Sequence, residues 1–258
     1  KDPPPPKQVH DSAGQTYRLV MPQHFQMGAR EWGDFRKDHT QPNETDNRPV
    51  HPVILTRPYY VATTEVTVAQ FRGFVQQTGY QSKLGFKAVG WDPKDDSEGN
   101  IERSFREGEN FDWRDPGFEQ TDDHPVTCVS FADAQAYCEW LSSLEPGTTY
   151  RLPTEAEWEC AARAGTRTHF GFGDRYQSVI QKHANVADVA LEQAAPGRTL
   201  DQWLIDVRND PSDGFAMTGP VGHYRPNALG LHDMHGNAWE WCSERYLDTG
   251  YQQFKKRR

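Results

Sequence analysis

The sequence predicts an irregular, loop-rich α+β domain, and three observations indicate this fold class. Three segments with helical spacing of apolar residues each begin at a side chain suited to cap a helix. Several short runs rich in β-branched and aromatic residues are typical of strands. Residues 166–258 carry Gly, Asn or Asp every few positions, which favours turns over long helices. Helices, short strands and a turn-rich half together fit an α+β arrangement.

The three helices are each expected to follow a capping box, in which a hydroxyl side chain is followed three residues later by an amide or carboxylate. These pairs are Thr67–Gln70, Ser130–Asp133 and Thr154–Glu157. Gly79 and Gly165 are placed to end the first and third helices, because glycine readily adopts the left-handed conformation of a helix C-cap.

Strands are expected at Tyr17–Met21, Phe25–Met27 and Val53–Leu55, and Tyr59–Ala62 leads into the first helix. Residues 81–123 show no sustained period, and a loop of that length in a compact domain is usually functional or disordered. Residues 1–15 are expected to form a tail or linker, because Pro3–Pro6 favours an extended polyproline conformation that buries nothing. A single domain is therefore expected over residues 16–258.

The composition limits both the core and the partners of this 258-residue chain. Only 35% of the residues are hydrophobic while 12% are aromatic, so we expect aromatic side chains to build the core, with Trp158, Trp239 and Trp241 buried. The formal net charge of −9 argues against nucleic acid or an anionic membrane as a partner. No run approaches the roughly 18 apolar residues of a membrane span.

The four cysteines do not form a recognisable metal or redox motif. Cys128, Cys138, Cys160 and Cys242 are widely spaced, and no CxxC occurs. Buried free thiols are the favoured interpretation, although one or two disulfides would also be compatible with this number. The compartment therefore stays open on the cysteines alone.

Two turn-rich clusters combine carboxylates with glycine in a way that suits a hard cation. They lie at Asp213–Phe215 and Asp233–Glu240, and neither has the spacing of an EF-hand loop. Calcium takes about 6–8 oxygen ligands from carboxylates and backbone carbonyls at about 2.3–2.6 Å. Hydrogen-bonded turns without a metal are the alternative. His232 and His235 are not expected to bind zinc as a protease does, because Gly236–Asn237 interrupts the helix that such a motif needs.

Six motifs, in this order along the chain, resemble those of the formylglycine-generating enzyme (sulfatase-modifying factor) family. They are Thr64–Thr67 (TEVT), Pro116–Phe118 (PGF), His124–Val126 (HPV), Arg151–Glu159 (RLPTEAEWE), Asn227–Leu231 (NALGL) and Gly236–Trp241 (GNAWEW). The match runs from about Tyr17 to Tyr246. The fourth and sixth motifs, Arg151–Glu159 and Gly236–Trp241, are the most specific of the six.

The resemblance implies a single domain with a fold related to the C-type lectins. Active members of the family oxidise a cysteine in a Cys-x-Pro-x-Arg segment of an unfolded sulfatase to formylglycine, using oxygen and a copper ion bound by a cysteine pair. The expected partner is therefore a sulfatase-like protein or peptide. Family members also carry structural calcium, which with the Pro-rich start would suit an exported protein.

The calcium ligands implied by the resemblance fall in the two clusters already described. The first site would use the side chains of Asn185 and Asp213 and the backbone carbonyls of Val186 and Phe215. The second site would use the side chains of Asp233 and Glu240 and the backbone carbonyls of Gly236 and Ala238. The family often has Asn at the Asp233 position, and a carboxylate there keeps an oxygen ligand.

The catalytic cysteines are where the sequence departs from the family. In the family they follow the Trp-Glu-Trp motif, in a segment that usually begins Arg-Gly-Gly-Ser, whereas this sequence ends at Lys255–Arg258. None of its four cysteines occupies a catalytic position, so no catalytic residue is assigned and copper is expected only with the missing segment.

Two hypotheses follow for the function of the chain. In the first, the chain is part of an oxidase domain, either as a fragment of a longer protein or as one part of a nicked protein. In the second, it is a divergent, non-catalytic, lectin-like module that binds a protein or glycan. The ergothioneine-pathway sulfoxide synthases share this domain, but the sequence contains neither their His-x-x-x-His-x-Glu motif nor their added helical bundle.

Overall fold

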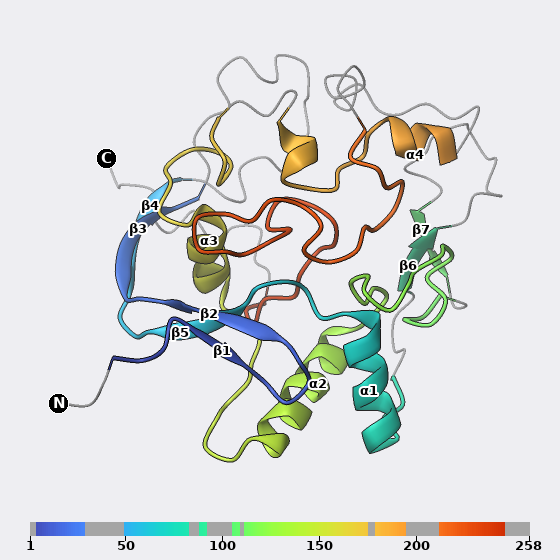
Figure 1. The fold of residues 1–258 in the computed structure, drawn as a ribbon, viewed down its shortest axis with the longest axis horizontal. Helices are drawn as coiled ribbons and strands as arrows, with labels where there is room; N and C mark the ends of the chain where they lie inside the picture. Colours follow the sequence, from blue (N-terminus) through green and yellow to red (C-terminus); the bar gives the residue numbers. More distant parts are fainter. Residues whose placement is uncertain are drawn as a thin grey trace.

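A computed structural model describes residues 4–28, 49–82, 88–91, 105–108, 111–174, 179–194 and 212–245. Within these ranges the predicted fold class is confirmed, because a few helices and short strand pairs are joined by long irregular segments (Figure 1). No helix among the described residues is long and apolar enough to cross a membrane.

The strands form three small antiparallel sheets. β1 (Gln8–His10), β2 (Thr16–Val20) and β5 (Tyr59–Ala62) make the first, with β2 in the middle, and β3 (Gln23–Met27) pairs with β4 (His51–Leu55) in the second. β6 (Ala88–Trp91) pairs with β7 (Phe105–Gly108).

Two expectations about irregular segments need correction. Residues 8–10 were expected in a tail but form β1, because their backbone groups pair with β2, and the following turn is held by buried Asp11. Residues 81–123 were expected to lack regular structure, yet they include β6 and β7, because two short segments about a dozen residues apart pair in register. Local sequence period does not reveal such pairings between distant segments.

The helices begin where their capping boxes predict. α1 (Val68–Thr78), α2 (Phe131–Leu144) and α3 (Glu155–Arg163) each show both reciprocal hydrogen bonds, from Thr67, Ser130 and Thr154 respectively. Gly79 ends α1 in the left-handed conformation as expected, whereas the left-handed C-cap of α3 is Ala164, one residue before Gly165. A 3₁₀ turn (η2, Ile180–Lys182) and the short α4 (Val189–Ala194) lie in the turn-rich half.

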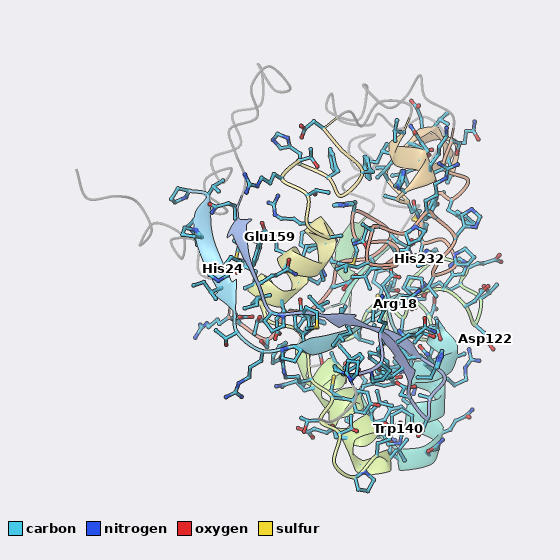
Figure 2. The ribbon with its side chains drawn as sticks, turned by 60° about the vertical axis from the view of Figure 1, so that its left-hand side comes forward. Arg18, His24, Asp122, Trp140, Glu159 and His232 are labelled. Atoms are coloured by element: carbon cyan, nitrogen blue, oxygen red, sulfur yellow. The ribbon has the colours of Figure 1, made fainter. Side chains whose placement is uncertain are left out.

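An aromatic cluster joins α1 to α2 at one end of the molecule. Phe71 and Phe74 of α1 contact Tyr137 of α2, with ring centroids 6.1 and 5.7 Å apart, and Trp113 lies 5.3 Å from Phe71. Figure 2 shows Trp140 of α2 at this end of the fold. The cluster confirms that aromatic side chains build the main core.

A second, smaller cluster fastens the 212–245 segment to α3. Leu231 and Met234 pack against Ala161 and Ala162, and all four are buried. The Asn227 side chain reinforces this contact, because its amide donates to the Ala161 carbonyl at 2.8 Å and its oxygen accepts from two backbone N–H groups of its own turn. These contacts place the Asp233–Glu240 loop beside α3.

The predicted burial of two tryptophans is wrong. Trp239 is fully exposed (104%) and Trp241 is 46% exposed, while Trp158 is half-buried. The indole N–H of Trp241 donates to the Val129 carbonyl at 3.1 Å, and its ring lies 5.8 Å from Phe131. Composition predicts how many aromatic residues must be buried, but it does not identify which ones.

Replacing Phe71 with alanine should lower the free energy of unfolding by about 3–5 kcal/mol, because its ring is enclosed by three other aromatic rings. Urea unfolding followed by tryptophan fluorescence measures this loss. Ile54→Ala is the matched control, since Ile54 is exposed and should cost less than about 0.5 kcal/mol. Equal effects of the two substitutions would contradict the placement of the core.

Candidate functional site

The candidate site lies in the 212–245 segment, which coils through the middle of the molecule between the first sheet and η2 (Figure 1). Figure 2 shows His232 of this segment above Arg18 of β2. The segment contains little regular structure, so side chains rather than helices or strands satisfy many of its backbone groups. Asp213, Asp233 and Asn237 contribute to this and belong to the two clusters predicted to bind calcium.

The structure brings together the four residues of the first predicted site. Asp213 is 7% exposed, and its two carboxylate oxygens accept hydrogen bonds from the backbone N–H groups of Val186, at 2.7 Å, and Phe215, at 3.0 Å. The buried Asn185 precedes Val186 and donates through its side-chain amide to the Met217 carbonyl. That bond orients the amide.

Asp188 supports the first site and is a residue that the sequence reasoning missed. It is fully buried, and its carboxylate accepts from the backbone N–H groups of Asp213 and Ala190, both at 2.7 Å. Burial, together with the Asp188 charge, raises the pKa of Asp213 to about 6 despite its hydrogen bonds. Two neighbouring buried carboxylates make this a site of negative charge. In the sequence, the only indication of this role was that Asp188, an acidic residue in addition to Asp213, stands three positions after Asn185.

The second predicted site contains a pair of buried carboxylates that lack sufficient donors. Asp233 is 2% exposed and held at a positive φ of 60°; its Oδ2 accepts from the Gly222 N–H at 2.7 Å, whereas its buried Oδ1 has no hydrogen-bond partner. Glu65 shows the same pattern, because Oε1 accepts from the Asn237 side chain at 3.0 Å and the buried Oε2 has no partner. An ionised oxygen left in this state costs free energy unless a proton or a cation reaches it.

The electrostatics of these carboxylates show that they affect one another. Burial, followed by the charges of Asp233 and Glu240, raises the pKa of Glu65 to about 9. Burial raises the pKa of Asp233 as well, while the hydrogen bond from the Gly222 N–H and the neighbouring Glu65 work in the opposite direction. Without a cation, the raised pKa of Glu65 favours its protonated form at neutral pH.

Glu240 lies at the outer edge of this group. Desolvation of its carboxylate and the Asp233 charge raise its pKa to about 7, although the residue as a whole is exposed, and Oε2 accepts from the Trp158 indole N–H at 3.0 Å. Glu65 is the second residue that the site analysis of the sequence missed. Its signal was its position in the Thr64–Thr67 motif, which gives no indication of where the side chain points.

No group of three or more His, Cys, Asp or Glu side chains placed to hold a metal ion occurs in the described part of the chain. A cation at either cluster would therefore depend on backbone and amide oxygens as well as on carboxylates. The predicted ligand sets have this mixed composition, with Val186, Phe215, Gly236 and Ala238 contributing backbone carbonyls. Such all-oxygen sets match the preference of calcium for hard ligands.

The four cysteines lie in separate surroundings. Cys138 is on α2, Cys160 on α3, and Cys128 has a positive φ of 53° ahead of the α2 cap. Burial raises the pKa of each of these three thiols to about 11, and that of Cys242 to about 12. The expectation of buried thiols is confirmed for Cys160, while the other three are half-buried; the raised pKa values disfavour the reactive thiolate in all four.

Comparison with known proteins identifies a family match over nearly the whole chain. The model of the sulfatase-modifying factor enzyme 1-like domain matches residues 6–257. The formylglycine-generating enzyme of Streptomyces coelicolor is 34% identical over 218 residues, which are 79% of this chain and 62% of that protein. The chain thus spans less than two thirds of the length of this relative.

Relatives with different activities are similar to this chain. The protein of Mus musculus described as inactive C-alpha-formylglycine-generating enzyme 2 is 30% identical over 239 residues, covering 84% of this chain and 68% of that protein. Among solved structures, PvdO from Pseudomonas aeruginosa superimposes with a TM-score of 0.68 at 27% identity, covering 98% of this chain and 79% of PvdO. Similarity at this level is compatible with either activity or inactivity.

Proposed function

Because the chain belongs to the sulfatase-modifying factor enzyme 1-like domain family, we propose that it is the scaffold of a domain that acts on a cysteine of a substrate protein, and that its own four cysteines do not oxidise that residue. The substrate class is a sulfatase-like protein segment of the Cys-x-Pro-x-Arg type, as the family resemblance implies. The observation that carries the second half of the proposal is the state of the four thiols.

Oxidation of this kind needs thiolates that converge on one copper ion beside the substrate cysteine, because soft thiolate ligands select Cu(I). Cys138 and Cys160 belong to different helices, and burial keeps both protonated at neutral pH. Cys242 has the most strongly raised pKa of the four, because burial and the neighbouring Glu240 and Glu244 both disfavour its thiolate. These residues do not fit a copper site, so no copper-dependent step is assigned to them.

The purified chain should not convert a Cys-x-Pro-x-Arg peptide to the aldehyde when it is supplied with Cu(I), oxygen and a thiol reductant. Mass spectrometry of the peptide should show an unchanged thiol mass, while an active formylglycine-generating enzyme under the same conditions provides the positive control. Turnover that disappears in the Cys242→Ser variant would contradict the proposal and would identify a relocated active site.

A second candidate function, binding of a protein or glycan without catalysis, is supported by the exposed Trp239 and Trp241. Large aromatic rings on a surface are typical of recognition sites. In the peptide experiment this function would appear as binding without turnover, weakened by Trp239→Ala but not by Met21→Ala, since Met21 is an exposed apolar residue of the first half of the chain. Turnover by the unmodified chain would exclude it as the sole function.

Calcium is the proposed structural cofactor of this scaffold. The second site provides the strongest support, because two buried carboxylates, Asp233 and Glu65, each present one unpartnered oxygen. The residues that would hold this ion are Asp233, Glu240, Gly236 and Ala238, with Glu65 beside Asp233. Those of the first site are Asn185, Val186, Asp213 and Phe215. When bound, the ions would neutralise buried carboxylates and bind distant loops to one another.

A further inference from the structure

The two candidate cation sites are joined by one side chain, that of Asn237. Its Oδ1 accepts from the Asn185 side-chain amide at 3.3 Å, on the first site, and its Nδ2 donates to Glu65 Oε1 at 3.0 Å, on the second. Its backbone N–H also donates to the Asn185 carbonyl at 3.0 Å. Asn237 therefore contacts a proposed ligand of the first site and the carboxylate beside Asp233 of the second, and in the sequence it stands between the proposed ligands Gly236 and Ala238.

The Asn237 amide cannot reorient for one site without disturbing the other. The backbone of Gly219 holds it from a third direction, because the Gly219 N–H donates to Oδ1 at 2.8 Å and the Gly219 carbonyl accepts from Nδ2 at 3.3 Å. A rotation that reversed oxygen and nitrogen would set donor against donor at Asn185 and acceptor against acceptor at Glu65. One orientation of the amide thus serves both sites.

We infer that Asn237 couples the two cation sites, so that filling one raises the affinity of the other. This inference rests on the proposed calcium binding. An ion at the first site orders the Asn185 amide, which fixes Asn237, and Asn237 then holds Glu65 in place for an ion at the second. The second ion consequently meets an ordered site and loses less conformational entropy on binding. Repulsion between the ions opposes the effect, but it is the same whether or not the Asn237 side chain is present.

Calcium titration by isothermal titration calorimetry tests the inference, with Asp213→Asn used to disable the first site. The affinity of the second site should be at least about 5-fold higher in the unmodified chain than in Asp213→Asn. When Asn237→Gly is present in both chains of this comparison, the ratio of second-site affinities should fall to about 1, while Asn237→Gly alone still binds calcium at both sites. Glycine suits this position because Asn237 has a positive φ of 72°. Ala164→Gly, at another left-handed position remote from the bridge, should keep the full ratio.

The outcomes separate failure of the inference from failure of the proposed function. No calcium binding by the unmodified chain would overturn both. If the unmodified chain binds two ions but its second-site affinity equals that of Asp213→Asn, the coupling alone would be overturned. The same holds if Asn237→Gly binds both ions and retains the full ratio. If Asn237→Gly does not fold, equal second-site affinities in the unmodified chain and in Asp213→Asn still overturn the coupling.

Discussion

Replacing Gly236 with alanine should abolish cation binding at both sites and lower the free energy of unfolding by about 1–3 kcal/mol or more. A Cβ at position 236 would lie 2.1 Å from the backbone oxygen of Asn185 and 3.1 Å from the Ala184 side chain. The obstructing atom is backbone, so it cannot rotate away. The loop that carries Gly236 must therefore move away from the segment that carries Ala184 and Asn185. This separates Asn185 of the first site from Asn237 beside the second.

Urea unfolding and calcium titration measure the two effects of Gly236→Ala. Gly73→Ala is the matched control, because Gly73 lies within α1 and a Cβ there would meet no atom within 4 Å. That control should be neutral or stabilising by roughly 0.5–1 kcal/mol, since alanine favours a helix more than glycine does. Equal stability of the two variants would show that the close approach of the two loops is not required.

Calcium should stabilise the folded chain more at pH 8 than at pH 6. Without calcium, the pKa of Glu65 is about 9 in the folded chain and has its ordinary value of about 4.5 in the unfolded chain. The folded state then binds more protons than the unfolded state between these values, so the stability of the calcium-free chain falls as the pH rises through this window. Calcium replaces that proton on the ionised carboxylates, so its affinity should increase by up to about tenfold per pH unit for each proton released.

Melting temperatures with calcium and with a chelator, at pH 6 and pH 8, measure this dependence. The Glu65→Gln variant provides the critical comparison, because glutamine has nearly the same size and its amide can donate to the unpartnered Asp233 Oδ1. It should bind calcium more weakly, and its calcium-free form should lose less stability between pH 6 and pH 8. A calcium response that is independent of pH and unaffected by Glu65→Gln would contradict the role of this carboxylate pair.

The local features of the fold could be predicted from sequence because each depends on a few neighbouring residues. A capping box closes two hydrogen bonds within four residues, and all three that were predicted, at Thr67, Ser130 and Thr154, are present. The family resemblance also rests on continuous motifs, and it placed Asn185 and Asp213 in one cluster, which the structure brings together through the Val186 N–H. Calcium itself remains a prediction of that resemblance.

Tertiary structure alone decided the contacts between distant segments, because these depend on which surfaces meet rather than on local propensity. Glu65 lies 168 positions before Asp233. The packing of Leu231 and Met234 on α3 and the hydrogen bond from the His232 N–H to the Thr63 carbonyl place the Asp233 loop near it. The same packing leaves Trp239 in solvent although its motif was expected in the core. The role of Asn237 arises in the same way: its amide bridges two loops because a left-handed backbone turns it between Asn185 and Glu65, and no pattern of neighbouring residues encodes that meeting.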